Sequence, residues 1–219
     1  MLIRREPRKR RSDDCAIDMN FVKHTMLCGW WVACAAASAA VLVPGSHVAD
    51  FTLADQAGAT HELYALSGKK AIVIMTVSNG CPIVRLAIPV MREIRARYES
   101  RDVEFLLLNP TLQDTRDAVM QEAAEFGFGM TILMDDKQTV GEAWGVNRTA
   151  EVFVIDPKTW MMVYHGPIDD RLNYETQRPV HHPYLTEALD AVLANKPVAV
   201  SSVVSPGCLI NFPDRKHRY

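Results

Sequence analysis

A short apolar run that ends in a cysteine and a proline places the strongest constraint on the fold of this chain. Residues 71–77 read AIVIMTV, are uncharged and rich in β-branched side chains, and are too few to cross a membrane. Such a run predicts a strand buried on both faces of a parallel sheet. A turn at residues 78–80 follows, then Cys81 and Pro82. We therefore expect Cys81 at the end of a buried strand.

The residues after Cys81 predict a helix that ends near Tyr98. Proline suits the first helical position because it has a fixed φ and no N–H to lose there. Apolar residues then recur at helical spacing, at Ile83, Leu86, Val90, Met91 and Ile94. Unpaired N–H groups and the positive end of the helix dipole would favour a thiolate at Cys81. The alternative is a buried cysteine without chemistry, which is common in protein cores.

The length and charge of the chain favour one folded domain and argue against nucleic-acid binding. Its 219 residues suit one domain of ordinary size with extensions. The first 24 residues hold seven basic and four acidic groups, which leaves 17 basic and 22 acidic in the rest, a net charge of −5. A mildly acidic domain argues against nucleic-acid binding. The basic head is better explained as part of a targeting signal.

An uncharged segment, residues 26–43, follows the basic head and includes the small residues AAASAA. This pattern predicts a secretory signal peptide, cleaved near Ala40. An uncleaved membrane anchor is the alternative, because the run approaches the ~20 residues that span a bilayer. Either way we expect export to the periplasm or another extracytoplasmic space. The predicted organisation is a leader at 1–44, a folded domain at 45–197 and an irregular tail at 198–219.

The rest of the domain predicts alternating strands and helices and then a hairpin. Expected strands lie at 48–53, 103–108, 131–134, 151–155 and 161–165, with a further stretch across the domain at 61–66. Expected helices lie at 114–126, 139–144 and 183–193. Early alternation and a late hairpin favour an α/β fold with a mixed central sheet and helices on both faces.

This order, with a cysteine after the first central strand, resembles the thioredoxin fold. The motifs are similar to those of its redoxin branch, the peroxiredoxin-like and thiol-disulfide oxidoreductase relatives, from about Val48 to Leu193. Exported members carry Cys-Pro-x-Cys-Arg and a proline four residues later. This frame is matched by Cys81, Pro82, Arg85 and Pro89, but Val84 stands in place of the second cysteine. Segments 48–53, 152–156 and 166–171 and the pair Gly207-Cys208 add to the likeness.

Two further departures from the family change what we expect of the site. The family's cis-proline is replaced by Ala150, after Thr149, so we expect a trans peptide and a reshaped site floor. In the peroxidatic motif Pro-x-x-x-Thr/Ser-x-x-Cys, Ser78 supplies the hydroxyl but Ile74 replaces the proline. The resemblance therefore implies peroxide chemistry only in part.

The resemblance implies thiol-disulfide exchange or peroxide reduction without a cofactor. Cys81 would attack a disulfide or peroxide, and Cys208 would resolve the product. Arg85 would support the thiolate, and Gly80, Pro82, Thr149 and Ala150 would face the substrate. The partners would be a thiol- or disulfide-bearing protein or a peroxide, and an external thiol reductant.

Three alternatives remain from the sequence alone. Cys81 and Cys208 are the only two of the five cysteines outside the leader, and in an oxidising compartment they suit a structural disulfide. A copper-binding, metallochaperone-like module would use Cys81 and Cys208 with His181 or His182, since soft thiolates prefer Cu(I). The third alternative is a non-catalytic interaction domain that kept the fold and lost the chemistry.

Overall fold

The computed structural model describes residues 42–171 and 179–213, all within one compact unit, Ser38–Tyr219. Most of the expected leader lies outside these residues, including the cysteines at 15, 28 and 34 and the cleavage point near Ala40. The described residues contain no helix that is both long and apolar enough to cross a membrane.

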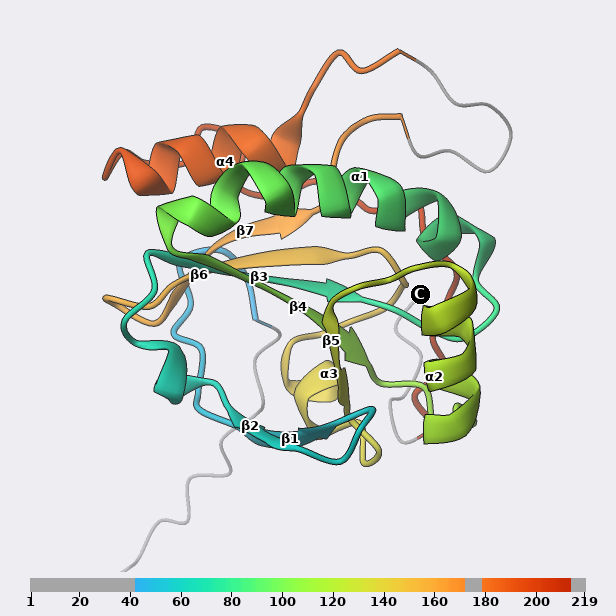
Figure 1. Ribbon diagram of the computed structural model, residues 1–219. Coiled ribbons are helices and arrows are strands. Elements are labelled where there is room, and N and C mark those ends of the chain that lie inside the picture. Colours follow the sequence, from blue (N-terminus) through green and yellow to red (C-terminus); the bar gives the residue numbers. More distant parts are fainter. Residues whose placement is uncertain (1–41, 172–178, 214–219) are drawn as a thin grey trace, which may run out of the picture. The chain divides into compact units, whose positions relative to one another are not determined.

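The described strands form a seven-stranded sheet in the order β2-β1-β5-β4-β3-β6-β7 (Figure 1). Strands β3, β4 and β5 run parallel, and the other pairings are antiparallel. The bounds are β1 Thr52–Asp55, β2 Thr60–Glu62, β3 Ala71–Thr76, β4 Val103–Asn109, β5 Thr131–Met134, β6 Val152–Asp156 and β7 Met161–Gly166. This is the mixed sheet of a thioredoxin-like α/β fold, as the sequence predicted.

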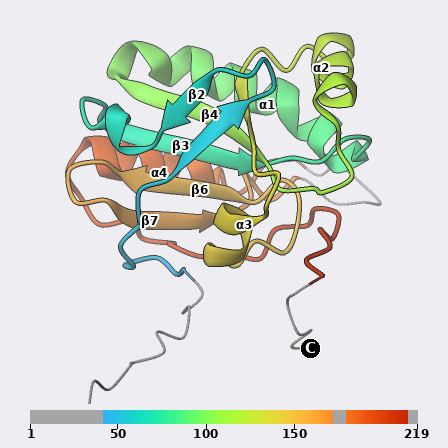
Figure 2. The same cartoon turned by 90° about the horizontal axis from the view of Figure 1, so that it is seen from below.

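Helices cover both faces of the sheet. The long helix α1 (Pro82–Tyr98) and helix α4 (Tyr184–Leu193) lie on one face, and the short α3 (Thr139–Ala143) lies on the other (Figures 1 and 2). Helix α2 (Arg116–Glu125) lies near the first turn of α1, and single 3-10 turns occupy Tyr64–Leu66 and Glu99–Arg101. Successive β3 side chains alternate between two cores: Val73 and Met75 pack under α1 and α4, and Ile72 and Ile74 pack on the α3 face.

The first strand begins later than the sequence predicted. Residues 48–53 were expected to form it, but β1 starts at Thr52. The N–H of Val48 instead bonds the carbonyl of Trp160, 2.7 Å away, and the carboxylate of Asp50 accepts the N–H groups of Phe51 and Tyr64. Because Val48 bonds Trp160 and a side chain satisfies the N–H of Phe51, the β1 ladder begins only at Thr52.

The C-terminal tail packs along the domain. In its described part, residues 198–213, it forms only isolated bridges, one of which pairs Arg148 with Leu209. Ile210 and Phe212 are 9% and 3% exposed and join the core on the α3 face. The amide of Gln138 donates to the carbonyl of Asn211 at 2.7 Å. Residues 198–213 thus form no helix or extended strand, and these contacts hold them against the domain.

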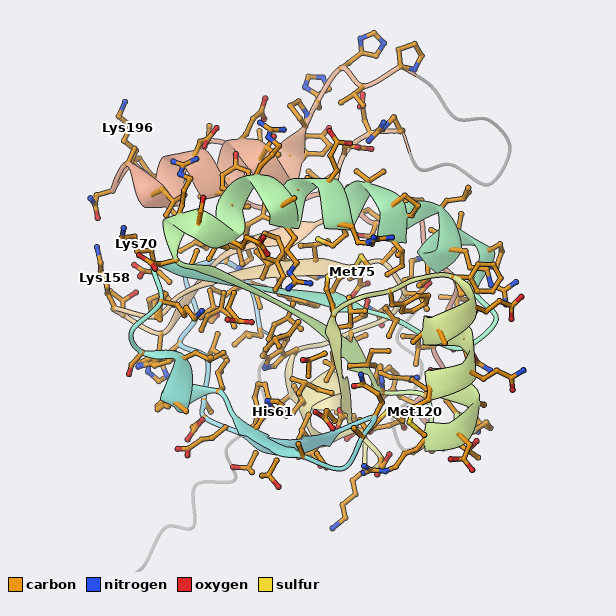
Figure 3. All side chains as sticks on the ribbon, in the orientation of Figure 1. His61, Lys70, Met75, Met120, Lys158 and Lys196 are labelled. Carbon is orange, nitrogen blue, oxygen red and sulfur yellow. The ribbon has the colours of Figure 1, made fainter. Side chains whose placement is uncertain are left out.

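The two ends of β3 differ in character. Lys70 precedes its first residue and lies with Lys158 and Lys196 at one end of the molecule (Figure 3). An open cleft of about 480 Å³ lies there, lined in part by these lysines and Pro44. Cys81 follows the other end of β3, so this cleft is not where the cysteine chemistry would occur.

Candidate active site

The local fold places Cys81 at the junction of β3 and α1, as the sequence predicted. A turn at residues 78–80 ends in Gly80, whose φ of 78° is one that residues with a side chain rarely adopt. Cys81 is the N-cap of α1 with extended backbone, and Pro82 takes the first helical position. The carbonyl of Cys81 accepts the N–H of Arg85 at 3.2 Å. The Cys81 side chain is only 4% exposed.

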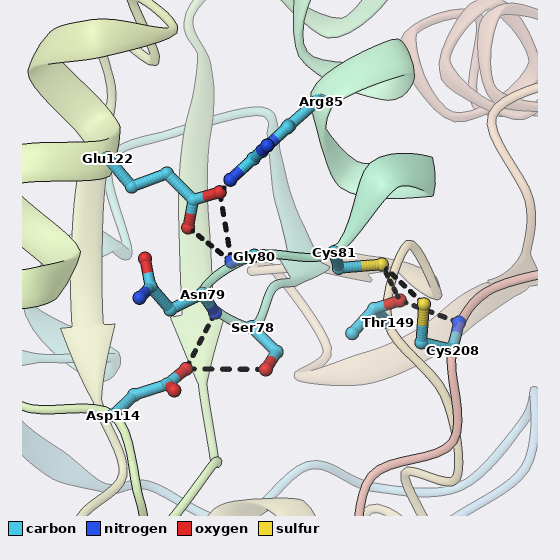
Figure 4. A network of polar contacts seen from close by, with 9 residues as sticks. All are labelled: Ser78, Asn79, Gly80, Cys81, Arg85, Asp114, Glu122, Thr149 and Cys208. Atoms are coloured by element: carbon cyan, nitrogen blue, oxygen red, sulfur yellow. Dashed lines mark hydrogen bonds and ion pairs between the residues drawn. The ribbon is translucent and has the colours of Figure 1, made fainter.

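The tail brings the second cysteine to the first. The Sγ atoms of Cys81 and Cys208 lie 2.8 Å apart although the residues are 127 positions apart in the chain (Figure 4). The two sulfurs are in hydrogen-bonding contact, and either could be the donor. A disulfide has its sulfurs about 2.05 Å apart, so bond formation needs a movement of less than an ångström.

Thr149 connects the two cysteines. Its Oγ1 lies 3.1 Å from the Cys81 sulfur and accepts the N–H of Cys208 at 2.9 Å. Its own N–H donates to the Cys208 carbonyl, also at 2.9 Å. A threonine hydroxyl has one proton to donate. Because Cys208 N–H occupies an acceptor position, that proton can point at the Cys81 sulfur.

The contact between the tail and the Thr149 loop requires a glycine. A Cβ placed on Gly207 would lie 1.6 Å from the Thr149 carbonyl oxygen, far inside any allowed contact. A guanidinium N–H of Arg148 donates to the Gly207 carbonyl at 2.9 Å. Beneath them Ala150 has a φ of 55° and donates its N–H to the Thr76 carbonyl. The site floor is thus built by Thr149 and Ala150 together with the tail.

Two carboxylates from the α2 region hold the turn on the other side of Cys81. Glu122, 6% exposed, accepts the Gly80 N–H at 2.8 Å and the Nε–H of Arg85 at 2.8 Å. Asp114 accepts the N–H of Asn79 at 2.7 Å and the hydroxyl of Ser78 at 3.3 Å. These bonds fix the turn that leads into Cys81 (Figure 4).

Two side chains lie differently from what the family frame implied. The Arg85 guanidinium is directed to Glu122 and stacks over the Phe126 ring at 4.1 Å, while the Cys81 sulfur points the other way (Figure 4). Ser78 donates to Asp114, and the hydroxyl at the Cys81 sulfur belongs to Thr149. The bond between the Arg85 guanidinium and the Glu122 carboxylate is charge-assisted and therefore strong, which favours this direction of the Arg85 side chain.

Three contributors to the site were not selected from the sequence: Glu122, Asp114 and Gly207. A carboxylate on the inward face of the helix predicted at 114–126 is a signal that would have found Glu122, because buried acids need partners. The Gly-Cys pair was noted, but only the structure shows why the glycine is required.

The side chains proposed as copper ligands do not lie together in one site. The described residues contain no group of three or more His, Cys, Asp and Glu side chains able to hold a metal ion. The N–H groups of His181 and His182 instead bond the carboxylate of Asp170 at 3.0 and 3.1 Å. These two bonds hold the pKa of Asp170 below its usual range, and the bond from the His182 N–H has the larger effect.

Comparison with known proteins agrees with this geometry. Residues 44–166 match the AhpC/TSA family. The chain belongs to that family. It is also similar to the thiol-disulfide oxidoreductase ResA of Geobacillus thermodenitrificans, with 30% identity over 112 residues, which are 51% of this chain and 63% of ResA. The match thus spans less than two thirds of that relative's length.

Solved structures extend the likeness over most of the domain. A hypothetical protein of Sinorhizobium meliloti is 28% identical, with a TM-score of 0.70 over 80% of this chain and 98% of its own. A Chlorobium tepidum protein described as a thiol:disulfide interchange protein DsbE is 20% identical, with a TM-score of 0.57 over 69% of this chain and 99% of its own. The second likeness concerns the fold alone. The AhpC/TSA match and this shared fold together identify the domain as a thioredoxin-like redoxin.

Proposed function

We propose that this redoxin is a thiol-disulfide oxidoreductase whose redox couple is Cys81 and Cys208. The 2.8 Å approach of their sulfurs supports the proposal most directly. The missing cysteine at Val84 is thereby replaced by one from the tail. The similarity to ResA favours the same chemistry.

The proposed reaction moves two electrons and two protons. Two thiols, Cys81–SH and Cys208–SH, become one disulfide as a partner disulfide is reduced to two thiols, and the reverse reaction oxidises a partner dithiol. Each step is attack of a thiolate on a disulfide sulfur through a mixed disulfide. The Thr149 hydroxyl, 3.1 Å from the Cys81 sulfur, can donate a hydrogen bond to the thiolate whenever Cys81 is the leaving group.

A structural disulfide is the competing explanation, and the redox potential separates the two. Structural disulfides have potentials below about −300 mV, and exchange-active ones lie higher. The full-length chain is equilibrated with mixtures of reduced and oxidised dithiothreitol. We expect the dithiol and disulfide forms of Cys81 and Cys208 to interconvert at a potential above that limit. Site-resolved thiol counting by peptide mass spectrometry checks that Cys81 and Cys208 change together. A lower potential would favour a structural role.

Turnover tests the function itself. Cys81→Ser and Cys208→Ser should each lower reduction of a model protein disulfide by about 100-fold or more, because neither variant can close the internal disulfide. The matched control is Cys34→Ser, a leader cysteine that the proposal does not use. Full turnover in either site variant would contradict the proposal, and no turnover by the wild-type chain would favour the non-catalytic interaction domain.

Peroxide reduction is a second candidate, favoured by the enclosure of Cys81. A small peroxide needs little access, and a sulfenic acid on Cys81 would have the Cys208 thiol beside it to form a disulfide and release water. Consumption of hydrogen peroxide coupled to loss of both thiols would support it. If the protein turns over disulfides but consumes no peroxide under the same conditions, thiol-disulfide exchange remains the proposed activity and peroxide reduction is rejected.

We also propose that the protein acts outside the cytoplasm, with residues 26–43 as signal peptide or tether. The evidence is the sequence pattern, basic residues followed by an uncharged run. Cell fractionation, with the mass of the exported chain, distinguishes a cleaved leader from an anchor. Recovery of the intact chain in the cytosol would contradict both.

A further inference from the structure

The two cysteines of the couple differ in their exposure to solvent. Cys81 is 4% exposed and belongs to the core cluster beneath α1 and α4. Cys208 is only partly buried, at the edge of that cluster. The residue after it, Leu209, is 73% exposed. The tail therefore covers the inner cysteine, Cys81, and leaves the outer one, Cys208, partly exposed.

From this arrangement we propose that Cys208 is the sulfur through which partner thiols and disulfides enter. The proposal rests on the proposed function and assigns the roles within it. It reverses the order implied by the family frame, in which Cys81 attacks and Cys208 resolves.

The proposed steps balance in both directions. A partner thiolate attacks Cys208 Sγ of the Cys81–Cys208 disulfide, a partner–Cys208 bond forms, and the electron pair of the broken bond leaves on Cys81. A second partner thiol then attacks the partner sulfur and releases Cys208 as a thiolate, so the partner is oxidised and the protein reduced. In reverse, Cys208 attacks a partner disulfide and Cys81 displaces the partner from Cys208.

The direction of attack supports this assignment. Displacement at sulfur requires the incoming thiolate to approach from the side opposite the leaving sulfur. For attack on Cys208 the leaving sulfur is the inner one, so the approach comes from the outside. For attack on Cys81 the approach would pass through the apolar cluster that surrounds it, which includes Val84 and Ala150. A partner larger than a small molecule can therefore reach only Cys208.

Hydrogen bonds from Thr149 to both cysteines agree with these two roles. The N–H and the carbonyl of Cys208 are both bonded to Thr149, so the outer sulfur is held while it is attacked. The same threonine hydroxyl lies 3.1 Å from Cys81 Sγ, where the leaving electron pair would accumulate. Thr149 thus positions the attacked cysteine and stabilises the departing one.

Mapping the mixed disulfide tests the proposal. The full-length chain, with Cys15→Ser, Cys28→Ser and Cys34→Ser to remove other thiols, is first oxidised. It is then mixed with reduced glutathione and quenched in acid within milliseconds to seconds, and peptides are read by mass spectrometry. We expect the earliest glutathione adduct on Cys208, in at least about tenfold excess over Cys81. An earliest adduct mainly on Cys81 would overturn the proposal.

Single-thiol variants give a second, independent readout. In the same background, Cys208 in the Cys81→Ser variant should react with a polyethylene-glycol maleimide at least about tenfold faster than Cys81 in the Cys208→Ser variant. The ratio should shrink with a small probe, iodoacetamide, because the difference is one of access. Circular dichroism confirms that both variants are folded. Equal or reversed rates with the large probe would overturn the proposal.

These results separate the proposal from the function on which it rests. If no Cys81–Cys208 disulfide forms under oxidation, the proposed function fails and the adduct experiment cannot begin. If the disulfide forms and turns over but the adduct is on Cys81, the function stands and the assignment of the entry sulfur is wrong.

Discussion

Cys81 lies between two loops that are held in opposite ways. The turn at residues 78–80 is tied by side-chain carboxylates, Glu122 and Asp114. The Thr149 loop is tied by the tail, mostly through main-chain atoms and the absence of a side chain at Gly207. The first loop uses charge, and the second uses close packing of backbone on backbone.

This difference predicts how each side responds to substitution. The Arg85 side chain of the Arg85–Glu122 pair is 39% exposed, so water screens much of its attraction. A backbone contact with no room for a methyl group has no such tolerance, because atoms cannot overlap. We therefore expect large effects on the tail side and small ones on the turn side.

The largest effect is expected from Gly207→Ala. The new Cβ would meet the Thr149 carbonyl at 1.6 Å, so the tail must move by more than an ångström. A displacement of that size costs about 100-fold in a reaction that depends on position. Formation of the Cys81–Cys208 disulfide with oxidised glutathione, followed by thiol loss, should slow by about that factor.

Gly68→Ala is the matched control for this change, since a Cβ there meets nothing within 4 Å. It should form the disulfide at the wild-type rate. A Gly207→Ala chain that also matched the wild-type rate would show that the tail is not needed in its observed position.

A smaller effect is expected from Thr149→Val. Valine keeps the shape of threonine but removes the acceptor for Cys208 N–H and the donor to Cys81 Sγ. Loss of a buried partner costs ~1–3 kcal/mol, roughly five- to 150-fold. The expected result is exchange with glutathione about tenfold slower, measured by stopped-flow. Thr149→Ser, which keeps the hydroxyl, should recover most of the rate, and equal losses in both variants would argue for packing alone.

Glu122→Gln sharpens the comparison from the turn side. Glutamine still offers an oxygen to the Gly80 N–H but no charge to Arg85. We expect a loss of about 1 kcal/mol in the free energy of unfolding, since the pair is partly exposed. Urea denaturation measures it, and exchange rates should change less than about threefold. An exchange defect as large as that of Gly207→Ala would remove the distinction between the two loops.

The sequence predicted the fold well because its main elements have strong local signals. The apolar run at residues 71–77 forms β3, Ala71–Thr76, and the helical spacing after Pro82 forms α1, Pro82–Tyr98. The predicted start of β1 was wrong because the Asp50 side chain binds the main-chain N–H groups of Phe51 and Tyr64. Such a contact leaves no periodic pattern in the sequence.

The site was predictable only on the side that lies close in sequence. Cys81 follows from strand, turn and helix signals, but its contact with Cys208 spans 127 positions and depends on where the tail runs. The threonine at the sulfur and the steric need for Gly207 depend on the same path. No local pattern records a contact between backbones so distant in the chain.

The smallest effect is expected from Arg85→Lys, measured on Cys81 itself. Were Arg85 the support of the thiolate, as the family frame implies, losing its planar guanidinium would lower the reactivity of Cys81 markedly. The structure pairs it instead with Glu122 and Phe126. Lysine keeps the charge but not the fork or the stacking, which costs a few tenths of a kcal/mol to about 1 kcal/mol in stability. In a Cys208→Ser background, the rate of reaction of Cys81 with iodoacetamide should change less than about twofold. A tenfold fall would show that Arg85 does support the Cys81 thiolate.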